Sequence, residues 1–218
     1  RRASWHMDFI YQLGGISPAQ EHIKVHFRNA AGDLDFETAA LHVHDKVRLE
    51  HTIFGDDFRF LRGVAAKATP KLTIPSPNMV HYRGGPAAID PAVYPDVEEF
   101  WSDLAGAYAE QVRRLAELGC TYLQFDDTSL AYLNDPAQRA MIAERGDDAE
   151  HLHLRYIKQI NRALAAKPPG MAVTTHMDQL CLSPQCGFSS TVEGNVLGSG
   201  HQLAKLRLIV ETAAEVWG

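Results

Sequence analysis

Four chemically reactive features stand where predicted strands end: Ser76, the pair Asp126-Asp127, His176 and Cys186. In parallel α/β folds the reactive groups sit at the carboxyl ends of the strands, so these side chains are the first candidates for a site. Imidazole and thiolate are ligands that zinc prefers, and zinc held by His176 and Cys186 would keep a substrate thiol deprotonated at neutral pH. Asp126 could hold a substrate ammonium group by a charge-assisted hydrogen bond.

Each of these features also has a structural interpretation. A histidine at a strand end is more often a structural residue than a metal ligand. The pair Asp126-Asp127 could simply cap the turn that follows it. Cys186 lies in a loop flanked by proline and glycine, which favours reactivity, whereas Cys120 and Cys181 lie in or beside apolar strands and are predicted core residues.

Strand and helix patterns alternate from about residue 68 to the end of the chain. Short apolar or β-branched runs predict strands at 71–75, 121–125, 171–175 and 179–182. Longer stretches with one apolar face predict helices from Asp96 to Gly119, over 149–166 and over the last residues. This alternation predicts an α/β fold with a parallel sheet or barrel.

The first third of the chain has a different pattern. Apolar and polar residues alternate over residues 22–50, with a turn at Asn29–Asp33, which predicts an antiparallel hairpin excursion attached to the α/β fold. The opening residues RRASWHMDF show no signal for the start of a helix. We interpret this beginning as a cut into the middle of a fold.

The predicted strands at 171–175 and 179–182 are separated by only His176, Met177 and Asp178. Two parallel strands need a crossover of a dozen or more residues, and no Gly or Asn is present for a tight hairpin. We therefore expect a missing segment between Met177 and Asp178, whose Cα atoms should lie far more than the usual ~3.8 Å apart. The alternative is that one of the two runs is not a parallel strand.

The composition of the chain indicates which binding partners and which cellular compartment to expect. The 218 residues have 45% hydrophobic content, 22% charged content and a formal net charge of −6, which argues against nucleic acid as a partner. No apolar stretch is long enough for a membrane span. The three cysteines form no CxxC pair, which indicates a reducing compartment, so we expect a cytoplasmic protein. Oligomeric state is left open.

Five segments together resemble the cobalamin-independent methionine synthase family. They are YLQFDDTSLAYL, THM, LCLSPQCGFSSTVEGN, SWHMDFIYQLGG and KLTIPSPNMVHYRGG. SPQCGF and QFDD are the more specific of these motifs, and the last two segments are similar to the shorter, single-barrel bacterial members. The resemblance extends over nearly the whole chain.

The resemblance implies one (β/α)8 TIM barrel domain over residues 1–218. It implies a zinc-dependent methyltransferase in which zinc binds the homocysteine thiol and a methyl-folate co-substrate donates the methyl group, giving methionine. By motif, His176 resembles the first zinc ligand and Cys186 the last, and Asp126 resembles the residue that holds the amino group of homocysteine. The stretch from Ser76 to Tyr82 would line the donor pocket.

The chain also departs from the family pattern. The family's His-x-Cys motif needs a cysteine where Asp178 stands, and its zinc-ligating glutamate has no counterpart. Both of these zinc ligands are absent at the junction between Met177 and Asp178, where we expect a segment to be missing. The family's opening strand would precede Arg1. We therefore expect an incompletely represented barrel whose zinc is incompletely liganded. The alternatives are alkyl transfer to another thiol such as coenzyme M, a metal-free decarboxylase-type barrel, and a metal-free, non-catalytic binding barrel.

Overall fold

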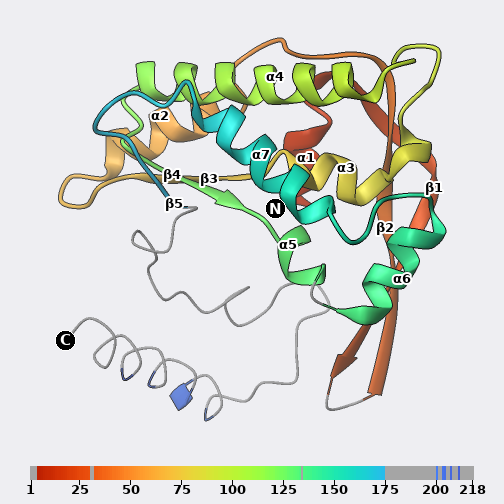
Figure 1. Cartoon of the computed structure of the whole chain (residues 1–218). Coiled ribbons are helices and arrows are strands. Elements are labelled where there is room, and N and C mark those ends of the chain that lie inside the picture. Colours follow the sequence, from red (N-terminus) through yellow and green to blue (C-terminus); the bar gives the residue numbers. More distant parts are fainter. Residues whose placement is uncertain are drawn as a thin grey trace. The chain divides into compact units, whose positions relative to one another are not determined.

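The computed structural model describes residues 4–29, 32–133 and 135–174, with residues 200, 203, 204, 207 and 211 (Figure 1). Internal contacts divide the chain into two compact units, one of residues 2–22 and 39–175 and one of residue 1, residues 23–38 and residues 176–218. The predicted zinc ligands His176 and Cys186 lie outside the described residues. So do the junction between Met177 and Asp178, the predicted strand at 179–182 and most of the last predicted helix.

A parallel sheet forms the centre of the larger unit. Its strands are β3 (Lys71–Pro75), β4 (Tyr122–Asp126) and β5 (Ala172–Thr174), paired in the order β3-β4-β5. These are three of the predicted strands, and strands that follow each other in sequence are neighbours in the sheet, as they are around a (β/α) barrel. Within the described residues the sheet is open and is not a closed barrel.

Two long helices connect the strands. Helix α4 (Val97–Glu117) follows β3 and α7 (Leu152–Leu164) precedes β5; the two contact each other on one side of the sheet (Figure 1). Helix α4 begins where predicted, because the Asp96 side chain accepts a hydrogen bond from the Glu98 N–H. It ends before Gly119, whose φ of 86° is a left-handed conformation that favours glycine. None of the described helices is long and apolar enough to cross a bilayer.

The shorter helical elements were not predicted from the sequence. They are α1 (Trp5–Ile10), α2 (Gly55–Val64), α3 (Asn78–Gly84), the 3₁₀ turn η1 (Pro86–Ala88), α5 (Ser129–Tyr132) and α6 (Pro136–Glu144). The expectation that the opening residues lack a helix start is wrong. Ser4 is the N-cap of α1, and its hydroxyl accepts a hydrogen bond from the Met7 N–H at 3.4 Å.

The predicted hairpin is present and longer than expected. Strands β1 (Leu13–Asn29) and β2 (Gly32–Leu49) pair in a two-stranded sheet, and the two residues between them permit only an antiparallel pairing. Strand β1 begins at Leu13, before the predicted start at residue 22. The sequence prediction missed this part of the strand because its first residues include glycines, which are rare in strands. Gly15 has a φ of 86°, and a Cβ there would lie 2.5 Å from the Asp45 carbonyl oxygen, so the close approach of the strands requires glycine.

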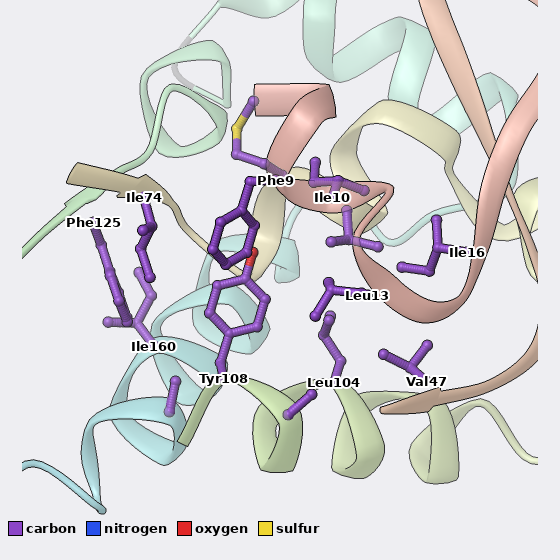
Figure 2. Packing of buried hydrophobic residues seen from close by; sticks show 14 of the residues in the cluster. Phe9, Ile10, Leu13, Ile16, Val47, Ile74, Leu104, Tyr108, Phe125 and Ile160 are labelled. Atoms are coloured by element: carbon purple, nitrogen blue, oxygen red, sulfur yellow. The ribbon is translucent and has the colours of Figure 1, made fainter. Parts of the chain in front are cut away.

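The hydrophobic core joins the N-terminal helix to the sheet and to α4 (Figure 2). Phe9 from α1 is fully buried and packs against the rings of Phe54 and Tyr108, with centroids 5.6 Å away in each case. The Tyr108 ring in turn meets the edge of Phe125 from β4 at 6.1 Å. Cys120 is buried beside β4, as its apolar surroundings predicted. Helix α1 is therefore an integral part of this unit.

Replacing Phe9 with alanine should lower the free energy of unfolding by about 3–5 kcal/mol, because a fully buried aromatic side chain would leave a cavity. The matched control is Phe60→Ala on α2, where the side chain is 73% exposed and the change should stay within about 0.5 kcal/mol. Urea unfolding followed by circular dichroism measures both. Equal losses in the two variants would contradict the placement of α1.

Candidate functional site

The carboxyl ends of β3 and β4 lie side by side. Pro75 is in register with Asp126, and the Ser76 N–H donates to the Asp126 carbonyl oxygen at 2.9 Å. Along β4 the side chains alternate, with Leu123 and Phe125 buried on the face that packs on the helices. Asp126 therefore lies on the opposite face, where its side chain is 34% exposed. The sheet thus places the backbones of Ser76 and Asp126 side by side.

Asp127 has a structural role. One of its oxygens accepts hydrogen bonds from the Ser76 hydroxyl at 2.5 Å and from the Asn78 amide at 2.6 Å. The other accepts from the Ser129 N–H at 2.8 Å, from the Ser129 hydroxyl and from the Leu130 N–H at 3.4 Å. These bonds cap α5 and tie it to the end of β3, so the capping interpretation holds for Asp127. They also fix the direction of the buried Ser76 hydroxyl.

Asp126 has a different environment. Its Oδ2 lies 3.1 Å from Nε2 of His6, a residue of α1 that is 120 positions away in sequence. A carboxylate only accepts hydrogen bonds, so Nε2 of His6 must hold the proton in this contact. The His6 ring stacks on Trp5, with ring centroids 4.2 Å apart. Asp126 therefore combines one hydrogen-bond partner with partial exposure to solvent.

Tyr82 belongs to an aromatic cluster on the α5–α6 side. Its ring stacks on Tyr132 with 5.3 Å between centroids and 6° between planes, and its hydroxyl donates to Gln138 at 3.0 Å. Arg145 donates from Nη1 to the Tyr82 carbonyl oxygen at 3.0 Å, and its guanidinium lies 5.8 Å from the centre of the Tyr82 ring. The result is a flat, half-buried aromatic surface.

Two buried polar atoms near these residues lack a hydrogen-bond partner within the described part of the chain. They are Oδ1 of Asn78 and Nη2 of Arg145. The amide of Asn78 must face Asp127 with its NH₂ group, because the carboxylate only accepts, so Oδ1 is the atom left over. A buried polar atom without a partner costs about 1–3 kcal/mol. Both atoms are therefore candidates for a bond to a ligand.

His81 is a buried residue of the stretch from Ser76 to Tyr82 that sequence analysis did not single out. Its Nδ1 lies 3.0 Å from the Tyr156 hydroxyl, its Nε2 lies 3.4 Å from Asp147, and its ring packs against Trp101. Burial, with the nearby positive charges of Arg145 and Arg155, lowers the pKa of His81 from 6.5 to about 3. The imidazole is therefore neutral at physiological pH.

This buried histidine should make the protein lose stability in mild acid. The unfolded state binds a proton at His81 below a pH of about 6.5, whereas the folded state does so only near pH 3, so acid favours unfolding across that window. Between pH 7.5 and 5.5 the loss from this group should be about 1–2 kcal/mol. His81→Gln should remove that part of the pH dependence in urea unfolding, whereas His44→Gln, at an exposed site, should keep it.

A hollow of about 600 Å³ lies beside His81, between the first turns of α4 and α7. Its walls include Trp101, Arg155 and Lys158 together with Asp147 and Asp148. Both signs of charge are present, and Arg155 already pairs with Glu98 at 2.5 Å. The hollow therefore shows no preference for a charged ligand of either sign.

The described residues contain no group of three or more His, Cys, Asp or Glu side chains that could hold a metal ion. The predicted ligands His176 and Cys186 lie outside them, so the zinc site stays a prediction. Their donor types, an imidazole and a thiolate, suit zinc, although zinc in proteins takes four ligands and two are proposed here.

The chain is similar to known proteins in sequence and in fold. No protein-family model matches the sequence. The uncharacterized proteins YxjH and YxjG of Bacillus subtilis (strain 168) are 29% and 28% identical to the chain, and each alignment covers all of it and 79% of the relative. The crystal structure of the Putative Vitamin-B12 Independent Methionine Synthase from Listeria monocytogenes matches 78% of the chain at 32% identity, with a TM-score of 0.58. The chain shares the fold of that protein.

The chain spans 44% of the length of the Listeria protein. The alignment to YxjH runs over 313 residues, although the chain has 218, so it contains long gaps on the side of this chain.

Proposed function

We propose that the chain is part of a zinc-dependent enzyme that transfers a methyl group to a thiol. The acceptor is homocysteine and the donor is a methyl-folate-type compound. One observation favours this above others: Asp126, the residue predicted to hold the amino group, is a partly exposed carboxylate on the carboxyl edge of the parallel sheet. The likeness in sequence and fold to a B12-independent methionine synthase supports the same reaction.

Asp126 supplies the contact that selects the acceptor. An ionised carboxylate forms a charge-assisted hydrogen bond with a substrate ammonium group and repels an anionic group in the same place. Homocysteine has an ammonium group, whereas coenzyme M has a sulfonate and no amino group. The position of Asp126 therefore favours homocysteine over coenzyme M as acceptor.

His176 and Cys186 would hold the zinc ion, with further donors from a segment missing between Met177 and Asp178. The long alignment gaps against YxjH support a missing segment. Bound zinc would lower the pKa of the acceptor thiol and keep it as the nucleophilic thiolate. The complete protein would close the three-stranded sheet into a (β/α)8 barrel, and the fold shared with the Listeria protein supports this.

The donor would bind over the stretch from Ser76 to Tyr82. The stacked rings of Tyr82 and Tyr132 offer a flat surface of the kind on which a planar heterocycle packs. The leftover acceptor Oδ1 of Asn78 would bind an N–H group of such a ring. Asp127 fixes the amide of Asn78 in the required direction, so the structural aspartate would orient the donor pocket.

The test is an acceptor assay with the complete protein reconstituted with zinc. Methionine should form from homocysteine and methyl-folate, at a rate that follows zinc content at about one ion per chain. Coenzyme M should be at least an order of magnitude poorer as acceptor. Turnover with coenzyme M and none with homocysteine would favour the rival alkyl transfer. A complete protein that never retains zinc would favour the non-catalytic binding barrel.

A further inference from the structure

We propose that His6 is a positioning residue that fixes the Asp126 carboxylate for the amino group of the thiol acceptor. This inference rests on the proposed function, in which Asp126 binds that amino group. The structure contributes the pairing itself: Nε2 of His6 lies 3.1 Å from Oδ2 of Asp126, across 120 positions of sequence.

The contact leaves half of the carboxylate available. Oδ2 is held by His6, and within the described residues Oδ1 has no hydrogen-bond partner. A carboxylate that is gripped at one oxygen loses the rotation that would otherwise spread its free oxygen over several directions. A substrate ammonium group would therefore meet Oδ1 in one orientation.

His6 is itself held firmly. Trp5 stacks on its ring, and α1 is anchored in the core by the fully buried side chains of Phe9 and Ile10. The His6 side chain is 21% exposed and that of Asp126 is 34% exposed, so solvent reaches the pair without surrounding it. Such an anchored, half-buried donor can set the direction of a neighbouring group more sharply than a mobile surface side chain can.

The imidazole suits this task because it donates one hydrogen bond to Oδ2 and leaves Oδ1 of the negatively charged carboxylate for the substrate. A lysine or arginine at the same position would cancel that charge and compete with the ammonium group. The pair therefore orients a carboxylate while keeping it available for a cation.

Two variants and two thiols separate positioning from a purely structural role. The thiols are homocysteine and 4-mercaptobutyrate, which has the same carbon chain and no amino group. His6→Ala should raise KM for homocysteine about tenfold, the effect of losing one oriented hydrogen bond, with kcat changed less than threefold. The same variant should leave KM for 4-mercaptobutyrate unchanged. His6→Gln keeps a side-chain N–H donor and should recover most of the homocysteine affinity.

His44→Ala, at an exposed histidine, serves as the matched control. The positioning role would be overturned if His6→Ala raised KM equally for both thiols, or if it left KM for homocysteine unchanged. Calorimetric binding of both thiols to wild type and variants requires no turnover. A wild type that binds homocysteine without methylating it would refute the proposed function, and the His6 inference would then be decided by binding alone. A wild type that binds neither thiol would refute both.

Discussion

Cys186→Ser protein should retain almost no zinc and should transfer methyl groups on the order of 10³-fold more slowly than the wild type. A serine hydroxyl stays protonated at neutral pH and is a poor ligand for zinc, so the proposed site would lose one of its two assigned donors. Metal activation of the thiol is worth several kcal/mol in the transition state, and each ~1.4 kcal/mol corresponds to a factor of ten in rate. Metal analysis and the methionine assay measure the two effects separately.

The control for this substitution is Cys120→Ala. Cys120 is buried, its thiol donates to the Tyr122 carbonyl oxygen at 3.4 Å, and burial raises the pKa of the thiol. It should therefore contribute nothing to zinc binding, and its removal should leave both zinc content and kcat near wild type. Full zinc occupancy in Cys186→Ser would remove Cys186 from the proposed site. Zinc loss in Cys120→Ala would contradict the assignment of Cys120 to the core.

Asp126→Asn should raise KM for homocysteine on the order of 10²-fold. The amide keeps the shape of the carboxylate but loses its charge, and a hydrogen bond to a charged group contributes about 1.5–3 kcal/mol. The KM for 4-mercaptobutyrate should stay unchanged, because that thiol has no amino group. Parallel kinetics with the two thiols provide the measurement.

The neighbouring residue provides a sharp comparison. Asp127→Asn should instead lower the free energy of unfolding by about 1–3 kcal/mol, because Asp127 accepts hydrogen bonds from Ser76, Asn78 and Ser129. Its effect on acceptor affinity should be small. If Asp127→Asn impaired homocysteine binding and Asp126→Asn did not, the two assignments at the end of β4 would have to be exchanged.

The sequence was sufficient to predict the regular elements of the α/β part of the chain. Strands β3, β4 and β5 were predicted within about a residue because their apolar runs are short and bounded by breakers, and α4 because Asp96 and Gly119 mark its two ends. Helix α1 escaped prediction because six residues form too little helix to give a periodic signal. Its stability comes from Phe9 and other buried side chains in the core.

The sequence predicted which types of residue make up the candidate site, but it did not predict which side chains form hydrogen bonds with each other. The alternation along β4 places Asp126 on the open face, but a pair of adjacent aspartates gives no sign of which one is saturated by hydrogen bonds. That distinction depends on Ser76 and Asn78, which come from the end of another strand. The contact between His6 and Asp126 spans 120 positions and has no spacing rule behind it.

The most direct test of the central claim is to count the sulfur neighbours of zinc by X-ray absorption at the zinc edge, with and without homocysteine. The proposed function predicts one additional sulfur at about 2.3 Å when homocysteine is added to the zinc-loaded, complete protein. No such change should occur with methionine, whose sulfur cannot become a thiolate. A zinc environment that is the same with and without homocysteine would contradict the claim that this protein activates a thiol at a metal.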